Sequence, residues 1–200
     1  MAQRGEGARV ITLDKRQLLV RHCAGDSAAF PELVIAFNGE VYSYLVRSGV
    51  PQADRDDLFQ EVFLSVHYAA KRYDPKLAIE PWLFTIVVNT VRDYFRKAKR
   101  RKEDSSSVLT PERIDPSPSP HQVSEAKDTA LWLERELQTL PFDQREAILL
   151  SYVKDLSQED VATALSLPLN TVKTHLRRGR LKLLEAHKVR NETVAKEAQS

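Results

Sequence analysis

Four carboxylates that lie close together in the first half of the chain are the first residues whose types and spacing could do chemistry. They are Asp54, Asp56, Asp57 and Glu61. Carboxylates at the start of a helix compensate the helix dipole, and they can also steer a basic protein partner into contact. A third hypothesis is a two-metal nuclease site, which needs grouped carboxylates. We favour it least, because no general base and no second carboxylate set is evident elsewhere in the sequence.

Two basic stretches stand apart from these carboxylates. The first lies within residues 92–102 and contains Arg92, Arg96, Lys97, Lys99, Arg100, Arg101 and Lys102. The second contains Lys173, Arg177, Arg178, Arg180 and Lys182. The whole chain has a net charge of only +2, so the segregation of charge is more informative than its sum. Two separate basic faces predict two contacts with a polyanion.

Aromatic and amide side chains accompany the first basic stretch. Tyr73, Trp82 and Asn89 all precede Arg92 closely in the sequence. A protein that holds an opened DNA strand must replace base stacking, and aromatic faces flanked by cations do so at about 1–3 kcal/mol per base. A purely structural role in the core is the alternative for the tryptophan, as we expect for its apolar neighbours.

Motifs for a metal, a nucleotide or a disulfide are missing from the sequence. The single cysteine, Cys23, cannot form an internal disulfide. The five histidines have no Cys or carboxylate partners at ligand spacing, and no Gly-x-x-x-x-Gly-Lys motif is present. We therefore expect no metal site, no cofactor and no catalytic residue. No run approaches the ~18 apolar residues of a membrane helix, which predicts a cytoplasmic protein without direct membrane insertion.

Two helical halves must position these residues, with a linker between them. From Arg101 the apolar periodicity is lost, and four prolines within residues 111–120 exclude a continuous helix. Proline and serine stiffen such a segment toward extended conformations. We predict domains at 13–100 and 128–188, and a linker at 101–127 that joins them flexibly but keeps them apart.

The first half is predicted to be helical throughout, because its apolar residues recur at intervals of three and four. Gly25-Asp26 and Gly49-Val50-Pro51 mark helix ends. A long amphipathic helix then starts at Asp54, and its apolar stripe is Leu58, Val62, Val66, Ala69 and Tyr73. A loop at 74–80 follows and leads to Pro81, which suits a first helical position.

The second half is predicted to hold four helical segments. Pro141 ends the first, and Asp143 could cap the second. Residues 157–160 are typical of a capping box that opens the third, and Asn170 could cap the fourth. The turn Ser166-Leu167-Pro168-Leu169 between the last two is typical of a helix-turn-helix. The predicted fold class is all-α, with two small helical domains, a flexible Pro/Ser-rich linker and a helix-turn-helix in the second domain.

The last helix has two different sides at about 100° per residue. Val172, Leu176, Gly179 and Leu183 share the side that we expect to pack inward. The opposite side would face a DNA groove and holds Asn170, Thr171, Thr174, Arg177 and Arg178.

Taken in order, the motifs of both halves resemble those of a known family. The first half contributes Gly25-Asp26, Ala29-Phe30, Asp56-Asp57-Leu58-Phe59-Gln60-Glu61-Val62-Phe63, Trp82-Leu83, Ile86, Asn89, Asp93 and Arg96. The second half contributes Leu140-Pro141, Arg145-Glu146, Leu156-Ser157, Glu159-Asp160-Val161-Ala162 and Thr171-Val172-Lys173-Thr174. This arrangement resembles the extracytoplasmic-function sigma factors of bacterial RNA polymerase, which consist of sigma regions two and four. The sequence departs from their pattern at Glu80-Pro81, at Ser166, where a glycine is usual, and at Gly179, where an alanine is usual.

The resemblance implies three binding surfaces. Core polymerase would be bound by Asp56, Asp57, Gln60, Glu61 and Phe63, with Phe63 or Leu64 as an apolar anchor. The opened −10 strand of a promoter would meet Tyr73, Lys76, Trp82, Asn89, Arg92 and Arg96. The −35 duplex would meet Asn170, Thr171, Lys173, Thr174, Arg177 and Arg178.

The resemblance also implies partners and a function. The partners are core RNA polymerase, promoter DNA and, as is usual in the family, an anti-sigma factor. The function is to direct the polymerase to promoters and to help open them, without enzymatic activity. A stand-alone helix-turn-helix regulator is the alternative, and it would use the second half in the same way without needing the polymerase.

Overall fold

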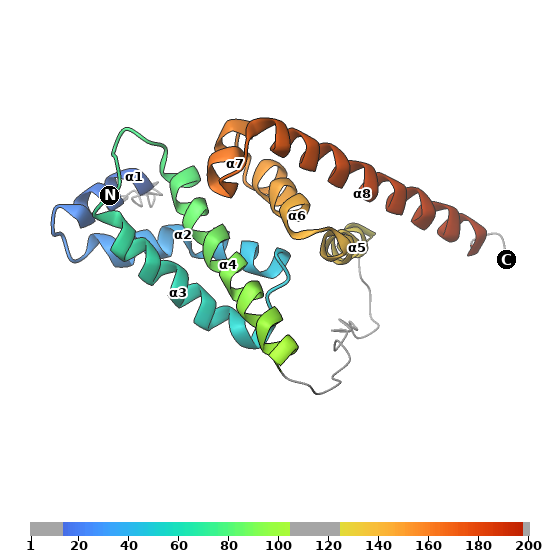
Figure 1. The fold of residues 1–200 in the computed structure, drawn as a ribbon, viewed down its shortest axis with the longest axis horizontal. Helices are drawn as coiled ribbons and strands as arrows, with labels where there is room; N and C mark the ends of the chain where they lie inside the picture. Colours follow the sequence, from blue (N-terminus) through green and yellow to red (C-terminus); the bar gives the residue numbers. More distant parts are fainter. Residues whose placement is uncertain (1–13, 105–124, 198–200) are drawn as a thin grey trace, which may run out of the picture.

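A computed structural model describes residues 14–104 and 125–197, with side chains for 14–101 and 128–192. These residues fold into helices, as predicted. The first half contains α1 (Lys15–Cys23), α2 (Ala29–Arg47), α3 (Gln52–Ala70) and α4 (Ile79–Asp104). The second half contains α5 (Glu125–Thr139), α6 (Phe142–Ile148), the π-helical turn η1 (Leu149–Val153), α7 (Gln158–Leu165) and α8 (Leu169–Glu197). Figure 1 shows the two helical groups and the long α8 that extends away from both.

The helix ends of the first half follow from local chemistry. Asp14 caps α1, because its carboxylate accepts hydrogen bonds from the backbone N–H groups of Arg16 and Gln17. Gly25 and Gly49 have positive φ angles of 95° and 84°, a conformation that favours glycine, and they turn the chain after α1 and α2. The predicted punctuation by these glycines is confirmed.

The core of the first half is built from the inner stripes of its helices. Leu33, Phe37 and Val41 of α2 are fully buried, as are Val62 and Val66 of α3 and Leu83, Phe84 and Val87 of α4. Helices with apolar residues three and four apart bury one face in this way. Helix α3 keeps an exposed outer face, whereas α4 also packs against α7.

In the second half, α7 and α8 form the predicted helix-turn-helix. Ser157 caps α7 by accepting the N–H of Asp160, so the predicted cap is present. Ser166 in the turn has φ 54° and ψ 42°, the left-handed region that a glycine adopts more easily. On α8, a Cβ at Gly179 would lie 2.5 Å from Cδ1 of Ile148, so the close approach of α6 accounts for this glycine.

Two predicted caps are wrong. Helix α6 begins at Phe142 after Pro141, so Asp143 lies inside its first turn. Helix α8 begins at Leu169, and Asn170 is already helical. Both expected helices exist, but each starts two residues earlier than a cap at Asp143 or Asn170 would place it.

The two halves pack against each other, which corrects the prediction that they are kept apart. Helix α7 lies on α4, as Figure 1 shows, and α5 also meets α2. The buried residues of both halves form one continuous apolar cluster. The linker expected at 101–127 lies largely outside the described residues. Its composition predicted an extended segment that separates the halves. They are not separated, because apolar residues of α4 pack against the second half.

Candidate protein- and nucleic-acid-binding surfaces

Helix α3 carries an acidic outer face. Asp56, Asp57, Gln60 and Glu61 are all exposed. Glu61 lies 3.6 Å from the ammonium of Lys97 on α4, and such an exposed pair is weak enough to be exchanged for a partner. Asp54 differs from these residues because it accepts a hydrogen bond from Tyr94 of α4. Burial and this carboxylate raise the pKa of Tyr94 to about 12, so Asp54 serves the contact between α3 and α4.

The structure puts Phe63 in the core instead of on this acidic face. Its side chain is 5% exposed and its ring lies 4.8 Å from that of Phe59. The next residue, Leu64, is 54% exposed. Of the two anchors suggested by the sequence, only Leu64 presents apolar surface to a partner. The exposed Tyr68, one turn further along α3, was missed, because a lone tyrosine on a helix gives no sequence signal of exposure.

The loop between α3 and α4 is fixed by Tyr73, which the sequence assigned to DNA. Tyr73 is buried, its hydroxyl donates to the carbonyl of Leu77 at 2.6 Å, and its ring lies 4.8 Å from Trp82. Tyr73 therefore supports the loop, and direct stacking on a base is not supported. Lys76 is exposed in the loop and Trp82 is half-buried at its end.

Helix α4 carries the other residues expected at the −10 strand. Asn89 and Arg96 are exposed, and Arg96 lies 2.9 Å from Asp93. The guanidinium of Arg92 contacts the Asn89 side chain at 3.4 Å. Arg92 also reaches the second half, where it lies 3.3 Å from Asp143. These residues follow one outer side of α4, as a strand-binding surface requires.

Pro81, which belongs to the pair at which the sequence departs from the pattern it resembles, is buried in the first turn of α4. The helix begins at Ile79, so Pro81 is its third residue instead of its first. A missing N–H is tolerated here because the first four N–H groups of a helix have no internal partner. The hydroxyl of Thr85 donates to the Pro81 carbonyl at 2.8 Å, a contact that the sequence did not suggest.

The basic side of α8 is exposed, as the periodicity predicted. Val172, Leu176 and Gly179 are buried, whereas Asn170, Lys173, Thr174, Arg177 and Arg178 are exposed and Thr171 is half-buried. Leu183 is only half-buried, because α8 has begun to leave the body of the second half. The hydroxyl of Thr174 donates to the carbonyl of Asn170 at 2.8 Å, and the side chain is exposed.

A cleft of about 230 Å³ adjoins this basic side. Lys173, Arg177 and Arg180 line it together with Tyr152, Gln158, Leu176, Leu181 and Leu184. The contribution of Tyr152 and Gln158 was missed, because they come from η1 and α7 and their approach depends on the tertiary fold. Among the described residues, no group of three or more His, Cys, Asp or Glu is placed to hold a metal ion. None of the described helices is long and apolar enough to cross a membrane.

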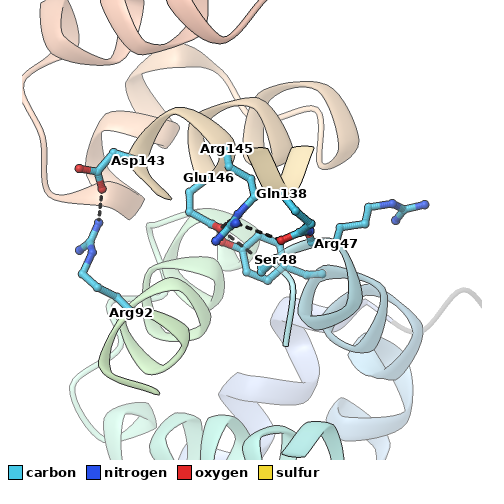
Figure 2. A network of polar contacts seen from close by, with 8 residues as sticks. Arg47, Ser48, Arg92, Gln138, Asp143, Arg145 and Glu146 are labelled. Atoms are coloured by element: carbon cyan, nitrogen blue, oxygen red, sulfur yellow. Dashed lines mark hydrogen bonds and ion pairs between the residues drawn. The ribbon is translucent and has the colours of Figure 1, made fainter. Parts of the chain in front are cut away.

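A buried polar network that was not predicted from the sequence joins the two halves (Figure 2). Glu146 of α6 is 0% exposed. It accepts hydrogen bonds from the hydroxyls of Tyr44 and Ser48 on the other half, and its second oxygen lies 3.3 Å from Nε of Arg145. Burial raises the pKa of Glu146, while its bonds to Tyr44 and Arg145 oppose that rise. Burial also raises the pKa of Tyr44, and the nearby carboxylate adds to the effect.

Both halves match families of known proteins. Residues 33–101 match the family described as Sigma-70 region 2, and residues 130–183 match Sigma-70, region 4. Together these matches span more than half of the chain, and they fall on α2 to α4 and on α5 to α8.

Individual relatives match across both halves. The chain is 31% identical to the ECF RNA polymerase sigma-E factor of Escherichia coli over 84% of this chain and 91% of that protein. It is 32% identical to the ECF RNA polymerase sigma factor SigE of Mycolicibacterium smegmatis, over 80% of this chain and 63% of that protein. Among solved structures, the sigma factor RpoE of Bartonella quintana, in complex with the anti-sigma factor NepR, is 25% identical. The similarity covers 80% of this chain and 97% of that one, with a TM-score of 0.67.

Proposed function

The chain belongs to the extracytoplasmic-function sigma factors, which direct RNA polymerase to promoters, and from this premise we propose how its residues divide that task. Residues 13–100 would act as sigma region two and residues 128–188 as sigma region four, with a linker at 101–127. The observation that carries the proposal is the presence of three distinct exposed faces, one acidic on α3 and two basic on α4 and α8.

The acidic face of α3 would bind core polymerase. Its members are Asp56, Asp57, Gln60 and Glu61, to which the structure adds Leu64. Carboxylates steer a basic partner and hold it in register, while an apolar side chain that becomes desolvated supplies binding energy. Phe63 would act only through this face, by filling the core beneath it.

The outer side of α4 and the preceding loop would hold the opened −10 strand. Lys76, Arg92 and Arg96 offer charge to phosphates, and the half-buried Trp82 can stack on a base from its exposed part. Asn89 is placed beside Arg92 to donate to a base edge. Tyr73 would contribute indirectly, because it fixes the loop against Trp82.

The exposed side of α8 would enter the major groove of the −35 element. Helix-turn-helix proteins present the N-terminal part of the second helix to base edges, which favours Asn170, Thr171 and Thr174 for that contact. Arg177 and Arg178 can reach a guanine or a phosphate, and only the first contact specifies sequence. Lys173 lies at the cleft beside α7, a position that suits a phosphate.

On this proposal the protein works by binding alone, in the cytoplasm where core polymerase and promoter DNA are found. The free energy for melting would come from contacts with the polymerase and the opened strand, with no hydrolysis step. An anti-sigma factor is a further proposed partner, since the structurally similar RpoE is solved in complex with one.

The experiment for this proposal is permanganate footprinting of open promoter complexes. Replacing Trp82 and Asn89 together by alanine should reduce thymine reactivity at the −10 element while leaving closed-complex formation nearly intact. The exposed Ile35 on α2 offers a matched control, because Ile35→Ala lies on another helix. Unchanged footprints in the double variant would contradict the assignment of the −10 surface.

A further inference from the structure

Two histidines from different helices lie side by side in the first half. His22 stands in the last turn of α1 and His67 in the last turn of α3, and these helix ends lie away from α8 (Figure 1). The two ring centres are 5.0 Å apart, and the ring planes are inclined by 45°. Phe30 of α2 packs on both rings, with centre-to-centre distances of 4.7 Å to His22 and 5.2 Å to His67. Because the two positions are far apart in the sequence, ligand spacing along the chain could not reveal the pair.

The distance between the two rings fits a shared metal ion. An imidazole nitrogen binds a divalent ion at about 2.0–2.1 Å, which places the ring centre roughly 3.2 Å from the ion. Two such rings at a tetrahedral angle have their centres about 5 Å apart. The rings of His22 and His67 have this separation. The torsion that rotates a histidine ring is broadly distributed, so a nitrogen of each ring can turn toward one ion while the ring centres stay in place.

The two imidazoles are available for a ligand. Among the described residues, no hydrogen bond or ion pair involves the ring of His22 or His67. Both side chains are half-buried, so water and a small ion can reach them. The other two histidines in the described ranges differ from this pair, because His187 lies 3.3 Å from the amide of Asn191 and Nδ1 of His175 is buried.

The surroundings favour the form of histidine that binds metals. A ligand imidazole must be neutral, and burial, together with the neighbouring His67, lowers the pKa of His22. Arg21 precedes His22 in the chain, but its guanidinium lies 2.6 Å from Asp26 and 3.3 Å from Glu32. The positive charge of Arg21 is therefore largely compensated before a cation approaches the pair.

We propose that His22 and His67 form a two-ligand site for a divalent transition ion of the class of Zn²⁺, Cu²⁺ and Ni²⁺, with water in the remaining coordination positions. Imidazole is a preferred ligand of these ions. Cys23 is not a third ligand, because its Sγ donates to the carbonyl of Ala70 at 3.1 Å and partial burial raises the pKa of the thiol. Two protein ligands hold an ion less tightly than the four of a structural zinc site, so the ion exchanges with solvent.

The bound ion ties together two helices that meet only at their ends. Helix α1 packs mainly on α2, and an ion shared by His22 and His67 adds a second tie from α1 to α3. The two ligands come together only in the folded chain, because they lie on different helices. Metal binding is therefore coupled to folding, and the ion stabilises the folded chain by mass action.

Titration of the full, untagged chain with Zn²⁺ alone tests the site. Isothermal titration calorimetry measures the stoichiometry and the affinity, and thermal unfolding with and without Zn²⁺ measures the stabilisation. The variants His22→Ala and His67→Phe each remove one ligand, and His67→Phe keeps an aromatic ring against Phe30. The controls are His187→Ala, which removes an exposed histidine of α8, and Cys23→Ser.

We expect the wild-type chain and both controls to bind one Zn²⁺ at this site and to unfold at a higher temperature when the ion is present. The variants His22→Ala and His67→Phe should bind Zn²⁺ at least about tenfold more weakly, because even the loss of a group that merely supports a ligand costs about 10–100-fold in metal affinity. Their unfolding temperatures should not respond to the ion. In nuclear magnetic resonance spectra of the wild type, the ring nitrogens of both histidines should shift together over one titration.

Three results would overturn the site. One is a folded wild-type chain that binds no Zn²⁺, and another is a folded His67→Phe variant that binds it as tightly as wild type. The third is loss of binding in Cys23→Ser, which would assign the ion to the thiol. Circular dichroism shows whether each variant is folded. If the ligand variants do not fold, the ring shifts of the wild type decide, because a site elsewhere would leave the signals of His22 and His67 unmoved.

Discussion

Among the described residues, and setting tyrosines aside, the first half buries only Ser48 and Thr90 as polar side chains, whereas α6 of the second half buries Gln144, Arg145 and Glu146 in succession. The first half is stable through apolar packing of long helices, and its charges are displayed outward. The second half uses buried charge on its inner side. Glu146 accepts hydrogen bonds from Tyr44 and Ser48 of the first half, whereas Arg145 contacts Gln138 and Glu146 of its own half. Apolar packing therefore stabilises the first half, and specific polar contacts orient the second half on its surface.

The largest expected effect tests the apolar base of the first half. Phe37 of α2 is 0% exposed, so Phe37→Ala should lower the free energy of unfolding by about 3–5 kcal/mol. Ile35 on the same helix is 73% exposed, and Ile35→Ala should change it by less than about 0.5 kcal/mol. Urea denaturation of both variants measures the contrast. If the two variants were equally stable, apolar packing would not be what stabilises the first half.

The next effect concerns the exposed side of α8. Arg177→Ala should weaken binding to the −35 duplex by about 1–3 kcal/mol and change the base preference if Arg177 contacts a guanine. If it holds a phosphate, all promoters should weaken alike and the dependence on salt should become less steep. Lys182 is an exposed basic residue on the same helix, and Lys182→Ala is the control.

Footprinting at fixed salt on matched and mutated −35 sequences separates these outcomes. Full protection by a variant without the side chains of Thr174, Arg177 and Arg178 would contradict the groove assignment. In that case the second half would display charge on α8 without using it for sequence recognition.

Periodicity predicted the sides of α8 well, because its inward residues meet α6 and α7 directly and the spacing of three and four records that contact. It did not predict the burial of Phe63, which follows Val62 and widens the buried face beyond a narrow stripe. Tyr73 is buried, in agreement with its place on the predicted apolar stripe, and its hydroxyl also donates to Leu77 within its own loop. The assignment of Tyr73 to DNA came from the family resemblance and not from periodicity.

The packing of the halves could not be predicted from local patterns at all. Residues 144 to 146 are an ordinary polar step in a helical pattern, and the first-half partners of Glu146 lie 98 and 102 residues away in the sequence. The proline-rich composition of the linker indicated that the halves are separated. Composition describes only the chain between the halves, so it carries no information on the surfaces that pack together.

A charge reversal on α3 tests whether its exposed carboxylates bind a partner, unlike the buried carboxylate of Glu146. Asp57→Lys should weaken binding to core polymerase roughly tenfold, or about 1.4 kcal/mol, because a basic partner would then face a like charge. Glu185→Lys on α8 makes the same change at another exposed carboxylate and should leave the affinity unchanged. Competition with a labelled sigma factor for core measures both. Equal competition by Asp57→Lys and wild type would remove α3 from the docking surface.

A smaller effect is expected in the helix-turn-helix turn. Ser166 has a positive φ of 54°, so Ser166→Gly should raise the free energy of unfolding by about 1 kcal/mol. Thr163→Gly, inside the helix α7, should lower it by roughly 0.3–0.5 kcal/mol, because glycine is a poorer helix former than threonine. Thermal unfolding of the two variants gives shifts of opposite sign. A destabilising Ser166→Gly would show that the turn is held by contacts of the serine side chain.

The smallest effect is a dependence on pH of closure, that is, of the packing of the second half against the first. Burial raises the pKa of Glu146 above its ordinary value of 4.5, so the closed chain binds more protons than an open one in which the carboxyl is hydrated. This contribution to closure is fully present below the ordinary pKa and is lost as the pH rises through the raised one. The radius of gyration should therefore increase modestly as the pH rises above the ordinary pKa of 4.5 and through the raised one. Glu146→Gln should flatten the curve, and an opposite slope would show that Tyr44, Ser48 and Arg145 stabilise the charged form more than burial disfavours it.

The central claim is that the chain selects promoters through both halves, and mapping of transcript 5′ ends tests it most directly. Core polymerase is supplied with the wild-type chain, with the Trp82 and Asn89 double variant, or with the Thr174, Arg177 and Arg178 triple variant. We expect the wild type to give defined start sites downstream of two shared sequence elements. The double variant should reduce initiation through the −10 element and the triple variant through the −35 element. Start sites that are the same with and without the chain would contradict the account.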